Sequence, residues 1–477
     1  MTRHKQWRTF LITLAVTSMS LTACAPQVIR ETVVVTRVVT EIVQVPSTPV
    51  VKEVIQTVVV TPTPAPPQKK LEIFHWWTSP EEGEAAEAML AMLASFNAKN
   101  PDIEVLENPG AKESSTDPRA VLQARFTAGM PPDTFQLLNG AELKNAVDDG
   151  ILQPLDDLYD GLGYAEAIPG PLLKAVSVDG HPYAVPFNIH IQNVLYYNLK
   201  LFNELKLTPP TSYAELLAAC KTISASKPDM TCLSLGAKDK WGVALILDSL
   251  LLDRGGPEYY ASLFKGEVDV FSDTNFKTAL ENFQRLIPYI NEDHSSLTWD
   301  QAVAQVSSGK AAITITGSWA ISDFIQNSEW QPGVDFGATT FPQKPERVIL
   351  FHSDTYGMTT NAPNPEATTE WLKVLASPEL QIPTDAIQGS LFARTDIDEA
   401  ELPDPIRQEL QGFIRENPGM LILDQFGSIL PLSAQPVYWD IIADFLVKPD
   451  ANEAIQDTAN MMATYSVKEA SAWYKWP

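Results

Sequence analysis

Along most of this chain, segments with the apolar pattern of strands alternate with segments that have the apolar spacing of helices. This alternation restricts the fold more than any other feature. Residues 71–77 have the apolar pattern of a strand, and residues 85–96 have helical spacing. Strands are expected again at 103–106 and 134–138, with a helix at 118–128 between them. This order predicts βαβ units and a largely parallel sheet. Because about 400 residues exceed one comfortable core, we expect an α/β fold with two lobes.

The amino terminus has the features of a secretory signal. Residues 1–23 hold three basic residues and no acidic one, with an apolar run over 10–21. This run is too short for a membrane span. The sequence Leu-Thr-Ala-Cys that ends at Cys24 resembles a bacterial lipobox, in which the cysteine is lipidated. We therefore expect a lipid anchor on Cys24; a plain signal peptide with an incidental cysteine is the alternative.

Residues 24–70 differ in composition from everything that follows them. Between 25 and 69 there are fourteen Val and seven Pro, with no Gly, Leu or aromatic residue. Pro-rich sequence favours extended polyproline II geometry, so we expect a semi-rigid stalk. Because Val runs are prone to pairing, an oligomerising β or helical stalk is the alternative.

The negative charge of the chain is concentrated after the stalk. The 477 residues carry 34 basic and 59 acidic side chains, a formal net charge of −25. The first 69 residues are net positive, so the acidic excess belongs to the folded body. Binding to a phosphate backbone requires clustered Lys and Arg, so no nucleic-acid partner is expected. This charge favours a neutral or weakly charged small molecule as the partner.

Cysteine and histidine are scarce. The chain has three Cys and six His, too few for a disulfide-dense scaffold or a four-cysteine zinc site, and a His metal triad is not expected. Cys220 and Cys232 would both be exported and would close a short loop. We therefore expect a disulfide between them.

Five ordered segments of the body resemble one protein family. They are His-Trp-Trp-Thr-Ser at 75–79, Asp-Gly-Ile-Leu-Gln-Pro-Leu-Asp-Asp at 149–157, the stretch 179–198, Thr-Pro-Pro-Thr-Ser-Tyr-Ala-Glu-Leu at 208–216, and Gly-Lys-Ala-Ala-Ile-Thr-Ile-Thr-Gly-Ser-Trp at 309–319. Together they resemble the extracellular solute-binding proteins of ABC importers, in the carbohydrate-binding group. The resemblance covers essentially all of residues 71–477.

The resemblance implies a type II periplasmic-binding-protein fold. Such proteins have two α/β lobes on either side of a ligand cleft, and the chain would cross the hinge near Asn188, Phe341 and Asp385. Ligands of open α/β sheets bind at the carboxyl ends of the strands, which agrees with a cleft at this place. The implied lobe limits are 71–187 with 341–384 for the N-terminal lobe, and 188–340 with 385–477 for the C-terminal lobe.

The resemblance also implies a function and a location. Members of this group capture a sugar and deliver it to the membrane subunits of an ABC permease, while ATP is hydrolysed on a separate subunit. We therefore expect no cofactor, a monomer, and an extracytoplasmic position at the cell surface or in the periplasm, held to the membrane by the lipid anchor. The glucose-type branch is similar, but Ser318 and Gln388 replace its usual Asp and Lys, and a His expected near 427–433 is missing. These departures weaken an assignment to glucose.

A sugar site needs aromatic planes for C–H faces and polar side chains for hydroxyls. Trp76 and Trp77 end the first strand and must point to opposite faces, and Trp319 closely follows another strand. Core packing is the alternative for each of them, and the Trp residues other than these three and Trp241 are expected in the core or at the surface. The candidate ligand-binding residues are Trp76, Trp77, Glu82, Gln136, Asn139, Asn188, His190, Trp241, Gly317, Ser318, Trp319, Asp354 and Gln388.

The polar candidates have structural alternatives. Glu82 could be a helix N-terminal acid stabilised by the helix dipole. His190 could be a buried structural group, and Asp354 could be a loop cap. Sequence alone leaves these choices open.

Motifs of common enzymes are missing from the sequence. It has no Gly-x-Ser-x-Gly, Walker A or His-Glu-x-x-His pattern. The paired carboxylates of a glycosidase leave no such motif, so a secreted glycan hydrolase is one alternative function. An adhesion lipoprotein with the stalk as its main part is another. We expect a binding protein and not an enzyme.

Overall fold

The computed structural model describes residues 34–43, 50–59, 69–78, 83–111, 118–426 and 428–471. The chain divides after Gln68 into two compact units. The expected signal segment 1–23, the expected lipidation site Cys24 and the candidate residue Glu82 lie outside the described residues. Within the described residues, no helix combines the length and apolar character that a bilayer crossing requires.

The first unit contains an antiparallel β-hairpin. Strand β1 (Val34–Val43) pairs with β2 (Val50–Val59) in continuous register, beginning with Val34 opposite Val59. The expectation of polyproline II geometry is therefore wrong for these residues. Both strands are rich in β-branched residues, and every Pro of the stalk lies outside them, so the local composition favours pairing.

The second unit, the body, contains a five-stranded mixed sheet with the strand order β4-β3-β5-β15-β8. The strand bounds are Ile103–Glu107 (β4), Lys69–Phe74 (β3), Thr134–Leu138 (β5), Asp354–Met358 (β15) and Ala184–Pro186 (β8). Strand β3 runs parallel to β4 and β5, whereas β15 runs antiparallel to β5 and β8. The expected βαβ start is present, but the sheet is not largely parallel.

A second mixed sheet has the order β11-β12-β10-β13. Its strands are Thr231–Ser234 (β11), Ala311–Thr316 (β12), Val194–Asn198 (β10) and Phe336–Thr340 (β13). Strand β10 runs antiparallel to both of its neighbours, and β11 runs parallel to β12. The prediction of mainly parallel pairing fails in both sheets. Strands β10 and β15 each arrive from another sheet and run antiparallel to both of their neighbours.

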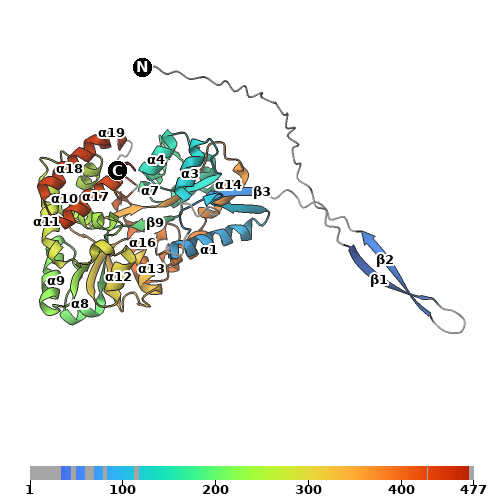
Figure 1. Cartoon of the computed structure of the whole chain (residues 1–477), viewed down its shortest axis with the longest axis horizontal. Coiled ribbons are helices and arrows are strands. Elements are labelled where there is room, and N and C mark those ends of the chain that lie inside the picture. Colours follow the sequence, from blue (N-terminus) through green and yellow to red (C-terminus); the bar gives the residue numbers. More distant parts are fainter. Residues whose placement is uncertain are drawn as a thin grey trace, which may run out of the picture. The chain divides into compact units, whose positions relative to one another are not determined.

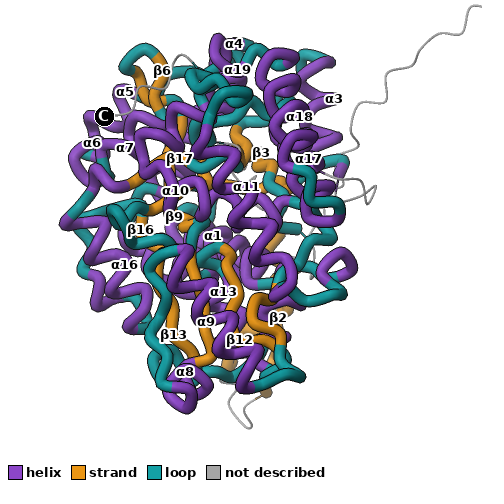
Figure 2. The backbone as a smooth tube through the Cα atoms, turned by 90° about the vertical axis from the view of Figure 1, so that its left-hand side faces the viewer, coloured by secondary structure: helices purple, strands orange, loops and turns teal. Residues whose placement is uncertain are grey.

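A third sheet connects the other two, and we call it the hinge sheet. Its order is β16-β9-β14-β17, with β16 at Leu391–Phe392, β9 at Asn188–Ile191, β14 at Ile349–His352 and β17 at Leu421–Leu423. Strand β9 lies between β8 and β10 in the sequence, and β14 lies between β13 and β15. The chain thus passes from one outer sheet to the other through the hinge sheet. In Figure 2, β9 and β16 lie between β3 above and β12 and β13 below.

The body therefore has the expected α/β, two-lobed type II fold. Figure 1 shows α10, α11, α17 and α18 at one end of the body and α1, α3, α4 and α14 around β3 at the other. The helices are α1 (Glu84–Lys99), α3 (Pro118–Thr127), α4 (Ala141–Asp148), α5 (Asp156–Leu162), α6 (Tyr164–Ala167), α7 (Gly170–Ala175), α8 (Leu199–Leu205), α9 (Tyr213–Ser226), α10 (Trp241–Phe264), α11 (Thr274–Leu286), α12 (Trp299–Ser307), α13 (Ala320–Gln326), α14 (Pro365–Leu375), α15 (Pro378–Gln388), α16 (Pro405–Glu416), α17 (Gln435–Val447), α18 (Ala451–Thr464) and α19 (Val467–Ala470). The lobe limits given above stay a prediction.

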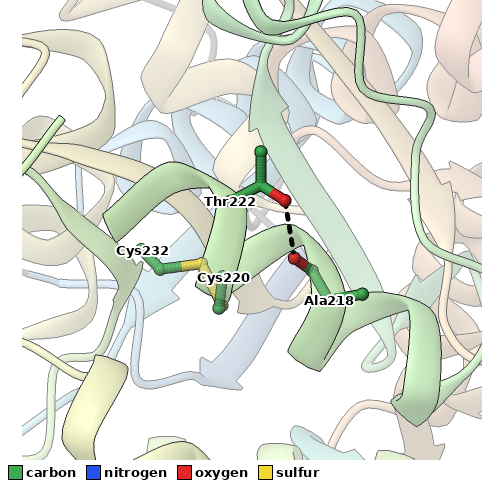
Figure 3. Close-up of a disulfide and its surroundings, with 4 residues drawn as sticks. All are labelled: Ala218, Cys220, Thr222 and Cys232. Atoms are coloured by element: carbon green, nitrogen blue, oxygen red, sulfur yellow. Dashed lines mark hydrogen bonds between the residues drawn. A yellow bond between two sulfur atoms is a disulfide. The ribbon is translucent and has the colours of Figure 1, made fainter. Parts of the chain in front are cut away.

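The predicted disulfide between Cys220 and Cys232 is confirmed. Cys220 lies on α9 and Cys232 on β11, and both side chains are buried (Figure 3). Beside the bond on α9, the Thr222 hydroxyl donates to the carbonyl of Ala218 at 3.0 Å. The bond ties a helix to the edge strand of the second sheet, away from the hinge sheet.

Candidate functional site

Two histidines face each other across neighbouring strands of the hinge sheet. His190 on β9 lies opposite His352 on β14 in the antiparallel register, and their ring centroids are 5.3 Å apart. Side chains of directly opposite residues share one face of a sheet, so the two imidazoles form a pair. Each has its own carboxylate: His190 Nε2 lies 3.3 Å from Asp354 Oδ2, and His352 Nδ1 lies 2.8 Å from Asp424 Oδ2.

Asp354 is held by amide side chains from two other strands. Gln136 on β5 donates to its Oδ1 at 2.8 Å, and Asn188 on β9 donates to its Oδ2 at 3.0 Å. The same Asn188 amide donates to Gln388 Oε1 at the end of α15, also at 3.0 Å. All three strands involved belong to the hinge sheet or the first sheet, so the network joins the two at the crossing.

Burial and hydrogen bonding set the ionisation of this network. Burial alone would raise the pKa of Asp354, but hydrogen bonds from His190 and Asn188 and the adjacent imidazoles hold it below its usual value. Burial lowers the pKa of His190 against the opposing effect of Asp354. Burial also raises the pKa of Asp424 despite its hydrogen bond with His352. Within the described residues, no group of three or more His, Cys, Asp or Glu side chains is arranged to hold a metal.

Aromatic rings form one side of the site, which we call the aromatic wall. It consists of Trp241, Trp299, Trp319, Phe426 and Trp439, all partly exposed. Trp319 makes edge-to-face contacts with Trp241 at 5.7 Å and with Trp299 at 6.2 Å between ring centroids. Phe426 contacts Trp241 at 5.8 Å and stacks on Trp439 at 5.2 Å. Helices α10, α12 and α17 thus bring their rings to one surface.

The aromatic wall adjoins the histidine pair. The Trp319 ring lies 5.7 Å from that of His190 and 6.3 Å from that of His352, and Phe426 lies 5.7 Å from His352. The rings are partly exposed while both imidazoles are buried. A ligand that covers the aromatic wall would therefore meet imidazole and carboxylate groups at its edge.

The turn before Trp319 is fastened to the hinge sheet. Ser318 donates its backbone N–H to the Ile191 carbonyl at 2.8 Å, and its hydroxyl accepts from the Ile191 N–H at 3.2 Å. A side chain at Gly317 would come within 2.2 Å of the Trp319 ring, so only glycine leaves room for the ring. Gly317 and Ser318 therefore position Trp319 through the backbone.

Trp76 and Trp77 have different surroundings. Trp77 is 6% exposed and packs edge-to-face on Phe187, with 6.0 Å between ring centroids. Trp76 is partly exposed, and the Arg119 guanidinium lies 4.3 Å from its ring centroid. Its backbone N–H donates to Gln136 Oε1 at 3.3 Å, which connects it to the Asp354 network. Of the two Trp residues, only Trp76 retains a ring surface beside the site.

Asn139 holds backbone groups and does not contact Asp354. Its Oδ1 accepts from the Ser353 N–H at 2.8 Å and from the Ser428 hydroxyl at 3.4 Å. It is fully buried, and its Nδ2 has no hydrogen-bond partner among the described residues.

The structure brings together most of the predicted residues and adds others. The predicted residues gathered at the hinge are Trp76, Gln136, Asn188, His190, Trp241, Gly317, Ser318, Trp319, Asp354 and Gln388. The residues that sequence reasoning missed are Gln192, Trp299, His352, Asp424, Phe426 and Trp439. Of these, His352 and Gln192 have a local signal, because each lies two residues from a predicted candidate, Asp354 and His190 respectively. Trp299 and Trp439, for which only core or surface packing was expected, belong to the aromatic wall.

Two polar atoms at this site have unused hydrogen-bonding capacity. Trp319 Nε1 and Gln192 Oε1 have no hydrogen-bond partner among the described residues. The other end of the Gln192 amide is engaged, with Nε2 at 2.7 Å from His352 Nδ1. Buried polar atoms are rarely left unpaired, so these two favour a polar ligand beside Trp319.

Solved structures share this fold over nearly their whole length. A chitin oligosaccharide binding protein aligns with a TM-score of 0.70 at 20% sequence identity, covering 84% of this chain and 99% of that one. Identity at this level shows the fold alone. The body therefore belongs to the two-lobed type II fold class.

Sequence comparison identifies the family. The family described as bacterial extracellular solute-binding protein matches residues 77–382. An uncharacterized ABC transporter extracellular-binding protein of Pyrococcus horikoshii is 31% identical over 410 residues, which are 85% of this chain and 90% of that protein. A probable sugar-binding periplasmic protein of Brucella melitensis is 30% identical over 332 residues, 69% of this chain and 76% of that protein. The chain belongs to the bacterial extracellular solute-binding protein family.

Proposed function

We propose that the body captures a neutral sugar in a cleft between its lobes, against the aromatic wall and the histidine pair. The observation that carries this proposal is the position of Trp319, whose partly exposed ring lies beside His190 while its Nε1 is unpaired. A sugar has apolar C–H faces that cover aromatic rings and hydroxyls that both donate and accept hydrogen bonds. The Trp319 ring can cover a C–H face of the sugar, and its Nε1 can donate to a hydroxyl. The buried polar groups nearby suit further hydroxyls.

The charges at the site favour a neutral ligand over an acidic one. The charged groups bonded to the imidazoles are the carboxylates of Asp354 and Asp424. A sugar acid would bring a third carboxylate toward them, and like charges in a buried site repel strongly. A carboxylate has about four lone-pair sites, so one that is already held by amides can still accept from a sugar hydroxyl, which suits a monosaccharide or a short oligosaccharide. Glucose is the first candidate from the resemblance, although Ser318 and Gln388 depart from that branch.

Sequence relatives support the sugar and the transport role. A relative at 30% identity is named as a probable sugar-binding periplasmic protein, and another at 31% identity is named as the extracellular-binding protein of an ABC transporter. We therefore propose that the closed form delivers its sugar to membrane permease subunits that work with a separate ATPase subunit. The lipid anchor on Cys24 would hold the monomeric protein outside the cytoplasm. Ligand would select the closed arrangement of the lobes by binding it more tightly.

Titration of the purified protein with a panel of neutral mono- and oligosaccharides tests this proposal. We expect at least one sugar to change the tryptophan fluorescence and to release heat in calorimetry. Trp319→Ala should abolish binding of that sugar. The matched control is Trp330→Ala, because Trp330 stacks on Phe324 away from the hinge and should bind as the wild type does. Binding by Trp319→Ala at wild-type affinity, or no response to any sugar, would overturn the assignment.

Binding without turnover separates this proposal from a glycan hydrolase. The family is one of solute-binding proteins, and Asp354 and Asp424 are each paired with a histidine. Incubation with oligosaccharides should therefore release no new reducing ends. Any reproducible release that Asp354→Asn abolishes would favour the enzyme.

A further inference from the structure

One short segment carries two members of the site and runs between the two halves of the body. Asp424, Gln425 and Phe426 follow β17, and Ser428 is the second residue after Phe426. Asp424 contacts His352, and Phe426 lies between Trp241 and its stacking partner Trp439. We call residues 424–426 and 428 the connecting segment; Gly427 lies outside the described residues. The two sides are joined independently of Gly427, because the Ile429 N–H donates to the Asp424 carbonyl at 3.0 Å.

Trp439 is also attached to the connecting segment by a hydrogen bond. Its Nε1 donates to Gln425 Oε1 at 2.9 Å. A displacement of the connecting segment would therefore move Phe426, the Trp439 contact and the Asp424 carboxylate together. One side of the aromatic wall depends on where this segment lies.

The far end of the connecting segment touches the start of α4, next to the first sheet. The Ala141 N–H donates to the Ser428 carbonyl at 2.8 Å, and the Ser428 hydroxyl donates to Asn139 Oδ1 at 3.4 Å. Between Asn139 and Ala141, Gly140 has a φ of 84°. A Cβ at Gly140 would lie 2.1 Å from the Ser428 carbonyl oxygen and 2.7 Å from its Cα. Backbone meets backbone here, so no side-chain rotation can make room.

We propose that Gly140 is a positioning residue for the ligand site, acting through Ser428 and the connecting segment on Asp424 and Phe426. The inference deepens the proposed function, on which it rests. Gly140 makes no contact with the aromatic wall itself; the absence of a Cβ lets Ser428 approach α4 and sets the distance between the first sheet and the wall. Misplacement of a contact group by about 1 Å can cost as much as a hundredfold in function, so this spacing determines which sugar fits.

The chain offers a matched control for Gly140. Gly150, just after α4, has a φ of 69°, and a Cβ there would meet nothing within 4 Å. Alanine at either position is strained by the left-handed backbone, but only at Gly140 does it also collide with another segment. Gly140→Ala should lower the affinity for the preferred sugar about tenfold or more. Gly150→Ala should bind within about twofold of the wild type, whatever it loses in thermal stability.

A double-mutant cycle distinguishes the positioning role from a general structural one. Because Gly140 acts through Phe426, Gly140→Ala should have a much smaller effect on affinity in a Phe426→Leu background. A cycle with Trp76→Leu, on the other side of the site, should be close to additive. Additivity with Phe426→Leu, or Gly140→Ala binding as tightly as Gly150→Ala, would overturn the inference.

Hydrogen exchange supplies a readout that needs no ligand. Peptides covering 421–430 should exchange faster in Gly140→Ala than in the wild type and in Gly150→Ala. If the wild type binds no sugar but this exchange pattern is seen, the positioning contact stands and the proposed function fails. If sugars bind and exchange at 421–430 is the same in all three proteins, the proposed function stands and the positioning contact fails.

Discussion

Asn327, directly after α13, donates a hydrogen bond from Nδ2 to Glu84 Oε1 at 3.3 Å, at the first residue of α1. The same amide group donates to Asp323 Oδ1 at 2.6 Å. Burial raises the pKa of Asp323 to about 6, with the Asn327 hydrogen bond opposing this and the Glu84 and Asp300 carboxylates adding to it. The Asn327 amide thus links α13 to α1, two helices far apart in the sequence, and also bonds the Asp323 carboxyl group, whose pKa is raised.

This link predicts a pH-dependent effect of Asp323→Asn on stability. The folded protein keeps the Asp323 proton up to about pH 6, whereas the ordinary value is 3.8. The stability from the protonated form is therefore fully present below about pH 4 and is lost as the pH rises through 6. The variant should match the wild type near pH 4 and exceed it by about 1–2 kcal/mol near pH 7.5, as measured by urea unfolding. A stability difference that is the same at both pH values would contradict this account.

Trp76 and Trp77 should respond differently to truncation. Trp77→Ala removes a buried ring packed on Phe187 and should cost about 3–5 kcal/mol of unfolding free energy. Trp76→Ala removes a partly exposed ring and should change stability little while weakening sugar binding. Thermal melts and titrations of both variants check this. A large loss of stability in Trp76→Ala with unchanged binding would remove Trp76 from the site.

Asp354→Asn should disturb the network more than its small change in shape suggests. Asp354 accepts from Gln136 on one oxygen and from Asn188 on the other, so an amide there must direct its NH2 group at a donor. We expect a loss of about 1–3 kcal/mol of stability and a strong loss of sugar affinity. Urea unfolding and calorimetry measure the two effects. Asp156→Asn, at an exposed position, is the control and should leave both unchanged.

Removal of the disulfide should lower stability without affecting the site. Cys220→Ala with Cys232→Ala opens a short loop between α9 and β11, which should cost about 2–4 kcal/mol. The midpoint of thermal unfolding should fall, whereas sugar affinity should stay near the wild-type value because the bond lies away from the hinge sheet. Mass spectrometry of the intact protein should show a gain of two hydrogens on reduction. Impaired binding in the folded double variant would show that the bond supports the site.

Cys24→Ala should release the protein from the membrane. If Cys24 carries the lipid, the wild type should sediment with membranes and the variant should appear in the soluble extracytoplasmic fraction. Cell fractionation followed by immunoblotting measures this directly. An unchanged distribution would favour a plain signal peptide, with the cysteine incidental.

The sequence predicts those parts of the site that depend on local features. Trp319 closely follows the end of β12, as predicted, whereas Gln136 lies in the middle of β5 and not at its end. Gly317 and Ser318 could be predicted from the same local motif, because they directly precede Trp319. The two-lobed fold could also be predicted, because alternating periods and ordered motifs extend through the body.

Pairing between distant strands is what the sequence could not predict. The His190 and His352 pair depends on the register of β9 against β14, and the second carboxylate comes from Asp424, more than seventy residues further along the chain. Phe426 follows β17 and meets Trp241 and Trp439, which come from two distant helices. Strands β10 and β15, which run antiparallel to their neighbours in the two outer sheets, each arrive from another sheet.

The hairpin of the first unit reduces the distance that residues 34–59 of the stalk can span. Twenty-six residues of polyproline II would span about 80 Å at 3.1 Å per residue. In the hairpin, Val34 lies opposite Val59, so the same residues advance the chain by about the 5 Å that separates paired strands. If Cys24 carries the lipid, the hairpin therefore adds little to the distance between the membrane and the body. Shortening the hairpin should leave that distance almost unchanged.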